Sequence, residues 1–365
     1  MADGYEQVNA TGIRAWIKRW RRRNRQLFNR VLTRMLGTVE AQRRALAGDT
    51  RRVLVVRLNK RLGNILFLTP MLRSLAASLP AATIDVLIQD PRHKPLLESL
   101  PGIGRVWIHD KSLVASLRLL RALRARGYDL AIDPSGNSSS DRIAIALSGA
   151  RQRMGFATYN QWVRLTHAAP RSRSRHHARQ AVELLELSVA DKHWETFDSL
   201  AVFPAQAAHR AASQHWNQAF GQATLTAPVV AFFTQATGNK QLDEAWWTAF
   251  QNQFGKHLPR AHLLLIRAPG APDPGDVASV SIAELDVLAA LLSRTGAFVA
   301  ADSGPMHLAA AAGVPVAGLF KSTDPASYAP LGPGCVCLTP DDLTPTRAVE
   351  AVAQMLARRP ASGAA

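Results

Sequence analysis

The fold of this 365-residue chain is decided by one stretch, Ala297-Phe298-Val299-Ala300-Ala301-Asp302-Ser303-Gly304-Pro305-Met306-His307-Leu308. The apolar run that ends at Ala301 predicts a buried strand, and the small residues from Leu308 to Ala312 predict a helix. A second apolar run, 314–320, follows Gly313, so the segment reads as strand, helix and parallel strand. Where a strand turns into a helix in this way, free N–H groups and the positive end of the helix dipole suit a phosphate or diphosphate.

The same alternation of apolar strand patterns and helical patterns continues towards the N-terminus. It predicts two series of buried strands, at 53–58, 84–88, 106–108 and 130–132, and then at 229–233, 263–266, 297–301 and 314–320. Helical patterns lie between them, at 64–79, 92–99, 112–126, 138–148, 243–254, 283–293 and 304–312. Alternation of this kind predicts an α/β protein with two doubly wound, Rossmann-like parallel sheets that face a cleft. The arginine-rich residues 151–180 read as a looser segment.

The boundaries that follow are a basic extension at 1–50, a first domain at 51–205, a second domain at 206–345 and a C-terminal helix and tail at 346–365. Pro204 and Pro228 bracket the join between the two domains. Cys335 and Cys337 are the only cysteines, and at i and i+2 of a strand they cannot form a normal disulfide. With no apolar run of ~18–20 residues and no signal-peptide core, we expect a reduced, cytoplasmic protein.

The chain carries a net charge of +17, and about half of that excess falls on one segment. Residues 13–36 contain nine Arg or Lys and no acid, and their apolar residues, Trp16 and Trp20 among them, recur at helical spacing. A basic amphipathic helix of this kind can lie on an anionic membrane surface, or it can pack its apolar face on its own domain. A nucleic-acid-binding arm is a third reading, but nothing downstream resembles a nucleic-acid module, so we expect no nucleic-acid partner. The remaining positive charge suits an anionic substrate.

Two further loops follow predicted strands. In Lys60-Arg61-Leu62-Gly63-Asn64, Gly63 suits a tight turn, and Asn64 suits either a helix cap or a ligand contact at the carboxyl end of a parallel strand. Lys60 and Arg61 favour an anion there. In Thr237-Gly238-Asn239-Lys240 the lysine could neutralise a departing phosphate.

At Asp302–His307 the plain reading is a capped helix with a core histidine. The crowding of Asp302, Ser303, Gly304 and His307 onto one junction favours a binding site instead.

Together these motifs resemble glycosyltransferase family 9, the ADP-heptose:lipopolysaccharide heptosyltransferases, over about residues 52–345. The segments that carry the resemblance are Val-Arg-Leu … Leu-Gly-Asn-Ile-Leu-Phe-Leu-Thr-Pro (56–70), Arg-Met-Gly-Phe (153–156), the helix with His177 and Arg179, the loop ending in Lys240, Asp-Ser-Gly-Pro-Met-His-Leu (302–308), Val-Pro (314–315) and Thr-Asp-Pro (323–325). The resemblance implies a GT-B fold with an acceptor domain, a nucleotide-sugar domain and inverting transfer in the cleft. It also implies work at the cytoplasmic face of the inner membrane on a lipopolysaccharide-type acceptor. No D-x-D sequence occurs, so we expect neither a metal nor another cofactor.

The resemblance also implies roles for individual residues. Donor binding is expected at Thr237, Gly238, Lys240, Asp302, Ser303, Gly304 and His307. Acceptor binding is expected at Lys60, Arg61, Arg153, Arg175 and Arg179.

One position departs from the family pattern. Asn64 stands where family members usually carry the aspartate that is the presumed catalytic base, and an amide cannot take up a proton. Three readings stay open. Another carboxylate serves, with Asp133 after the strand 130–132 as the first candidate and His93 and Asp141 as weaker ones. Alternatively, Asn64 only positions the acceptor, or the protein binds without catalysis.

Overall fold

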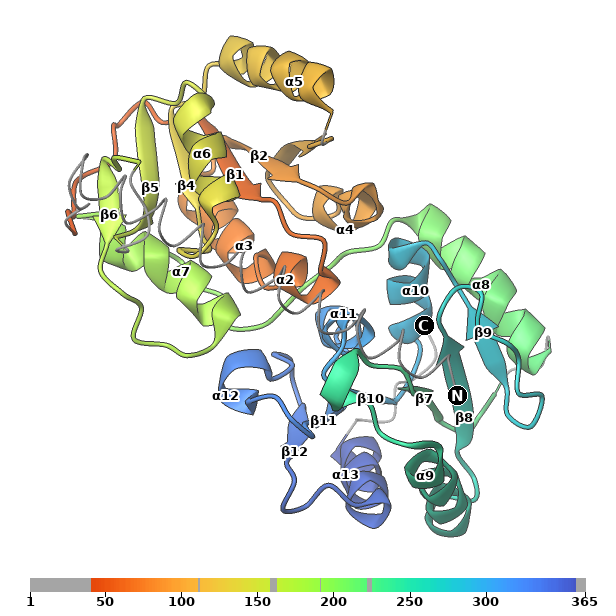
Figure 1. Ribbon diagram of the computed structural model, residues 1–365. Coiled ribbons are helices and arrows are strands. Elements are labelled where there is room, and N and C mark those ends of the chain that lie inside the picture. The colour runs from red at the N-terminus through yellow and green to blue at the C-terminus, as the bar shows by residue number, and fades with distance from the viewer. Residues whose placement is uncertain (1–40, 111, 158–162, 191, 222–224, 359–365) are drawn as a thin grey trace, which may run out of the picture.

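A computed structural model describes residues 41–110, 112–157, 163–190, 192–221 and 225–358. The predicted basic helix at 13–36 therefore lies outside the described residues. Two six-stranded sheets, each flanked by helices on both faces, form the described part of the chain (Figure 1). Every pairing between neighbouring strands is parallel, which confirms the predicted α/β architecture with two doubly wound domains.

The first sheet has the strand order β3-β2-β1-β4-β5-β6. Its strands are β1 (Arg52–Arg57), β2 (Thr83–Ile88), β3 (Ile103–Ile108), β4 (Leu130–Asp133), β5 (Gln152–Phe156) and β6 (His167–Ala169). Its helices are α2 (Leu62–Leu66), α3 (Thr69–Ser78), a 3-10 turn η1 (Pro91–His93), α4 (Lys94–Glu98), α5 (Leu113–Arg126), α6 (Ser139–Leu147) and α7 (His177–Ser188).

Alternate residues of the central strand β1 face opposite layers of this domain. Val53 and Val55 pack in the core with α3 and α7, whereas Leu54 and Val56 pack in the core that contains Leu123 of α5 and Ile145 of α6. Because both faces of a parallel sheet are covered, the strand reads as a continuous apolar run.

The second sheet has the strand order β12-β11-β10-β7-β8-β9. Its strands are β7 (Val229–Phe233), β8 (His262–Arg267), β9 (Ser279–Ser281), β10 (Ala297–Ala301), β11 (Val316–Leu319) and β12 (Val336–Leu338). Its helices are α8 (Gln206–Phe220), a 3-10 turn η2 (Gly238–Lys240), α9 (Glu244–His257), α10 (Leu285–Leu292), α11 (Gly304–Ala311), α12 (Pro325–Tyr328) and α13 (Pro345–Arg358).

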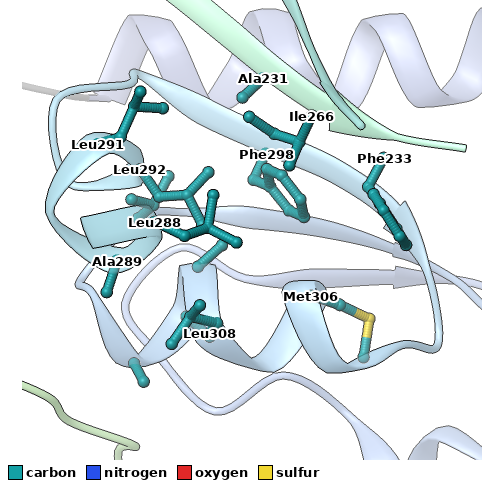
Figure 2. Packing of buried hydrophobic residues seen from close by; sticks show 14 of the residues in the cluster. Ala231, Phe233, Ile266, Leu288, Ala289, Leu291, Leu292, Phe298, Met306 and Leu308 are labelled. Carbon is teal, nitrogen blue, oxygen red and sulfur yellow. The ribbon is translucent and has the colours of Figure 1, made fainter. Parts of the chain in front are cut away.

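The same division into two layers holds the second domain together. Phe298 of β10 packs in one core with α8, α10 and α11, and Figure 2 shows its ring beside Leu288 and Leu292 of α10. Val299, the next residue, lies in the opposite core with α9 and α13. The apolar run quoted first is therefore buried on both faces, and α11 is anchored below it by Met306 and Leu308.

The predicted helix at 64–79 is wrong in one respect, because it is two helices, α2 and α3. Pro70 lies in the first turn of α3 and has no N–H to offer to the preceding turn. The Thr69 hydroxyl instead donates to the Leu66 carbonyl at 2.8 Å. The break gives α2 a direction of its own, and it lies beside α11 where the two domains meet (Figure 1).

The prediction of a looser segment at 151–180 is also wrong, because these residues form the strands β5 and β6. These strands are three to five residues long and carry basic or histidine side chains, so they lack an apolar pattern. Both thiols, Cys335 and Cys337, are free. Among the helices of the described residues, none has the length and apolar character needed to cross a bilayer.

Candidate functional site

A cavity of about 650 Å³, here called the central cavity, opens where α2 of the first domain meets the second domain. Residues of the first domain form one wall and the carboxyl ends of β7 and β10 form the other. It is lined by Arg61, Leu62, Gly63, Asn64, Phe67, Phe233, Gln235, Ala236, Thr237, Lys240, Asp302, Ser303, Gly304, Pro305, His307, Thr323 and Tyr328. The cavity thus brings together the three loops that the sequence singled out.

The junction after β10 supplies the polar end of this cavity. Ser303 is the N-cap of α11, but its side chain makes no capping hydrogen bond, and its buried Oγ has no partner among the described residues. Gly304 and Met306 lie in the first turn, where backbone N–H groups have no intrahelical acceptor. A buried hydroxyl and a free helix N-terminus at the wall of one cavity form a site for an anion.

Asp302 contacts the side chains of Lys240 and His307 at this junction. Its Oδ2 lies 3.2 Å from the Lys240 Nζ, and its Oδ1 lies 3.5 Å from the His307 Nε2. Burial alone would raise the pKa of Asp302, but the hydrogen bond from His307 and the charge of Lys240 outweigh burial and keep this pKa below its usual value. Asp302 is therefore ionised at neutral pH, and Lys240 is fixed beside the N-terminus of α11.

The loop before Lys240 is held in shape by its own hydrogen bonds. The Gln241 side chain donates to the Thr234 carbonyl at 2.8 Å and accepts from the Ala236 N–H. Gly238 has φ +64°, a conformation that favours glycine, and this turn aims Lys240 at the cavity. Thr237 lines the cavity, whereas Gly238 contributes the turn.

Gly63 touches the second domain directly. A Cβ at this position would lie 2.8 Å from the His307 Cδ2, closer than real contacts allow. The predicted tight turn is wrong, since Gly63 lies inside α2 without a positive φ. The predicted cap is also wrong, because Arg61 is the N-cap of α2 and Asn64 follows within the helix.

Asn64 lines a second, small cavity of about 30 Å³, here called the side cavity. Arg57 at the end of β1 and His177 at the start of α7 also line it. Phe67 and Asn64 line both cavities, and the Phe67 ring centroid lies 4.7 Å from that of His307 and 6.2 Å from that of His177. Asn64 is thus placed where a molecule in the side cavity would meet one in the central cavity.

Asp133 lies elsewhere. It is fully buried, and its Oδ2 accepts from the Arg142 Nε at 3.0 Å while its Oδ1 accepts from the Ser135 N–H and hydroxyl. It lines neither of the two cavities. Its place at a strand end is as predicted, but its engaged oxygens argue against a role as proton acceptor. Asp141 is also buried, and its Oδ1 accepts a hydrogen bond from the Leu58 N–H at 2.9 Å.

The predicted acceptor residues separate into two groups. Arg61 lines the central cavity, and Lys60 lines an adjoining cavity of about 250 Å³, here called the flanking cavity, together with His93. Arg153 and Arg175 line none of these cavities. Arg153 instead donates to the Arg164 carbonyl at 3.1 Å, and Arg175 pairs with Asp324 of the second domain at 2.5 Å.

Arg179 lines a separate cavity with Glu183, Glu186 and Asp198, so three of the predicted acceptor residues lie away from the site.

Among the lining residues that were not predicted as site residues are Arg57, Phe67, His177 and Tyr328. Arg57 ends a parallel strand, which is a signal that the sequence does contain. Phe67 directly follows α2, whereas His177 and Tyr328 belong to α7 and α12, and only the docking of these helices brings the three rings together. In the part of the chain that the structure describes, no group of three His, Cys, Asp or Glu residues could hold a metal ion.

Comparison with known proteins gives a sequence match over the second domain. Residues 280–355 match the family model described as glycosyltransferase family 9 (heptosyltransferase). The matched stretch runs from β9 into α13 and contains the whole β10–α11 junction with Asp302 and His307. No curated protein sequence matches the chain.

Solved structures share the fold over both domains. A glycosyl transferase family 9 protein from Veillonella parvula aligns with a TM-score of 0.74 at 19% identity, over 86% of this chain and 99% of that one. ADP-heptose lps heptosyltransferase II of E. coli aligns with a TM-score of 0.67 at 18% identity, over 84% and 99%. E. coli heptosyltransferase WaaC with ADP aligns with a TM-score of 0.63 at 17% identity, also over 84% and 99%.

The two parallel sheets and the cavity between them define a protein of the GT-B class, which these structures share. The family-model match over the β10–α11 junction adds the sequence signature to the fold. Residues 280–355 therefore match glycosyltransferase family 9, and both domains share the fold of its solved members.

Proposed function

We propose that the protein transfers a heptose or a related sugar, with inversion, from a nucleotide diphosphate to a lipopolysaccharide core-type acceptor. The observation that carries this proposal is the Lys240–Asp302 ion pair beside the free N-terminus of α11, inside the central cavity. A solved relative, WaaC, is described with ADP and with ADP-2-deoxy-2-fluoro heptose, which supports ADP-heptose as the donor.

In this proposal the donor lies in the central cavity with its diphosphate at the N-terminus of α11. The diphosphate would lie between Lys240 and the N–H groups of Ser303 and Gly304, because Lys240 lies beside the N-terminus of α11 and Arg61 lies on the wall formed by the first domain. As the bond to the sugar breaks, negative charge grows on the departing phosphate, and Lys240 is placed to neutralise it. Asp302 keeps Lys240 in position and is close enough to the cavity to contact the sugar, while His307 supports Asp302.

The nucleoside fits the flanking cavity. That cavity shares Leu62, Phe233, Gly304 and Pro305 with the central cavity, so a single ligand can extend from one into the other. Its remaining wall is largely apolar, with Ile266, Ile282, Leu285 and Leu288, as a base requires. The acceptor would approach from the side cavity, where Arg57 offers a charge to phosphates or acidic sugars.

A second candidate function is binding of lipopolysaccharide precursors without catalysis. Asn64 favours it, because no carboxylate occupies that position and an amide takes up no proton. Incubation of the protein with nucleotide sugars and core acceptor separates the two functions, since turnover excludes a silent protein.

We infer peripheral association with an anionic membrane from the composition of residues 13–36 and from α5. Leu113, Val114 and Leu117 on α5 are 76%, 55% and 51% exposed, and α5 contains no acidic residue. Exposed Arg118 and Arg121 follow on the same helix. Exposed apolar residues beside arginines suit the headgroup region of anionic lipids. Flotation with anionic vesicles tests this: loss of binding without residues 1–50 assigns the membrane contact to that extension, and loss in a Leu113→Ser/Leu117→Ser variant assigns it to α5.

Donor binding is tested by titration calorimetry with ADP. Lys240→Ala removes a charged hydrogen bond worth about 1.5–3 kcal/mol, so the dissociation constant should rise roughly 10- to 150-fold. The exposed Lys256→Ala on α9 is the matched control and should leave the affinity unchanged. Equal affinity in the two variants would remove Lys240 from the donor site.

A further inference from the structure

The catalytic position has no carboxylate of its own, and the cavities supply no free one. Among the described residues that line the central and side cavities, Asp302 is the single carboxylate. Both of its oxygens are engaged, one by Lys240 and the other by His307. A transfer that releases a proton from the acceptor hydroxyl therefore needs another group with an accessible lone pair.

His177 is the histidine that lines the side cavity with Asn64. It is the first residue of α7 and lines the side cavity that Asn64 also lines. Its ring rests on the rings of Tyr328, with a centroid distance of 4.9 Å, and Phe67, at 6.2 Å. Phe67 belongs to the first domain and Tyr328 to the second, so both domains hold the ring in position.

Gln180, one turn further along α7, determines which ring nitrogen carries the proton. The Gln180 Nε2 donates to the carbonyls of Ser174, at 3.1 Å, and Arg175, at 3.3 Å, which fixes the orientation of the amide. The Gln180 Oε1 therefore faces the His177 Nδ1 at 3.3 Å and accepts its proton. The lone pair is left on Nε2, which hydrogen-bonds to none of the described residues.

We propose that His177 is the general base of this protein, in place of the carboxylate that is missing at Asn64. The inference rests on the proposed sugar transfer. Asn64 would orient the acceptor hydroxyl, and the His177 Nε2 would accept its proton.

The protonation state of the imidazole agrees with this role. Burial lowers the pKa of His177, the Gln180 hydrogen bond opposes this, and the positive charge of Arg57 lowers the pKa further, so the ring is neutral at neutral pH. Arg57 faces the ring from β1, Tyr328 faces it from α12, and the neighbouring His176 is also neutral because burial lowers its pKa to about 4. No carboxylate of the described residues that line the side cavity opposes these effects.

The acceptor oxygen forms a bond to the anomeric carbon as the bond from that carbon to the diphosphate oxygen breaks. The electron pair of the broken bond leaves with the diphosphate, whose charge Lys240 and α11 stabilise. The proton of the acceptor hydroxyl passes to the His177 Nε2, and the imidazolium releases it to water after the product leaves.

The test compares turnover of the full chain with ADP-heptose and core acceptor in four proteins. His177→Gln should lose ~10²–10⁴ in kcat with little change in ADP affinity, because the base is lost and the donor site is intact. The control is His193→Gln, an exposed histidine that lines neither cavity, and it should behave as the wild type. Asn64→Asp in the His177→Gln background should restore turnover and move the acidic limb of the pH profile to lower pH, because a carboxylate then accepts the proton.

A second measurement needs no turnover. Nitrogen-15 NMR of His177 should show a neutral ring at pH ~7 with the proton on Nδ1. A protonated ring, or a proton on Nε2, overturns the proposal. Turnover that survives His177→Gln overturns it while leaving the proposed transferase in place. Intact ADP binding without turnover in the wild type overturns both the transferase and the base.

Discussion

Substitution of Gly63 by alanine tests whether the contact between the two domains sets the affinity for the donor. The Cβ of alanine would lie 2.8 Å from the His307 Cδ2, at least 0.6 Å short of an ordinary contact of 3.4 Å. His307 is buried and its ring packs edge-on against Phe67, so it has little room to withdraw. The strain is relieved most easily by separating α2 from α11, which opens the central cavity.

The size of the effect follows from this geometry. Overpacking by one methyl group in a close-packed region costs about 1–3 kcal/mol. If that cost opposes closure of the domains around the donor, the ADP dissociation constant rises roughly 5- to 150-fold. His307 starts 3.5 Å from Asp302, and a shift of about half an ångström takes it beyond hydrogen-bond reach, which loosens Asp302 as well.

Titration calorimetry with ADP measures the change, and thermal unfolding with and without ADP separates closure from folding. Gly255→Ala is the matched control, because Gly255 also lies inside a helix, α9, and has nothing within 4 Å of an added Cβ. That control should gain roughly 0.5–1 kcal/mol of stability from helix propensity and keep its ADP affinity. If Gly63→Ala behaves like the control, the close approach of α2 to His307 does not govern donor binding.

Two further predictions concern the buried charges of the first domain. Arg142→Met leaves Asp133 buried without its partner, so the free energy of unfolding in urea should fall by roughly 3–5 kcal/mol. The control Arg347→Met breaks an exposed ion pair and should lower it by at most about 1 kcal/mol. Similar losses in the two variants would contradict the structural role of Asp133. Burial, and then the charge of Asp133, raises the pKa of Asp141 from its ordinary value of 3.8 to about 6. Between pH 3.8 and pH 6 the folded protein therefore keeps a proton on Asp141 that the unfolded chain has released. The free energy of unfolding of the wild type therefore falls as the pH rises through this range. Relative to the wild type, the free energy of unfolding of Asp141→Asn should rise by up to about 3 kcal/mol between pH ~4 and ~7. A difference that does not depend on pH would refute the raised pKa.

The sequence was sufficient for the architecture and for the grouping of the Lys240 loop and the Asp302–His307 junction at one cavity. The run that ends at Ala301 and the helix after Ser303 have the expected bounds, because a doubly covered strand and a helix N-terminus leave local signals. The site at Lys240 is equally local, since it depends on a turn a few residues long. The short strands β5, β6 and β9 were missed, because three to five residues are too few for a periodicity to show.

What the sequence lacked was the relation between segments far apart in the chain. Asp133 ends a parallel strand and on that rule belongs to the cleft, yet Arg142 of α6 encloses it. His177 gave only a family resemblance, because its neighbours Asn64 and Tyr328 come from other helices. Gly63 read as a turn residue, since nothing near it in sequence reveals that His307 lies against it.

The contact between α2 and α11 also constrains how the sequence can vary over evolutionary time. Gly63 faces His307, and Gly304 in turn faces Leu62, where an added Cβ would lie 3.1 Å from the Leu62 Cβ. Each helix thus presents one small and one large residue to the other, in opposite order. A larger residue at 63 requires a smaller one at 307, whereas a larger residue at 304 requires a shift of only a few tenths of an ångström at 62, so the constraint is stronger on the first pair. In aligned relatives these two pairs of positions, about 240 residues apart in the chain, should therefore co-vary.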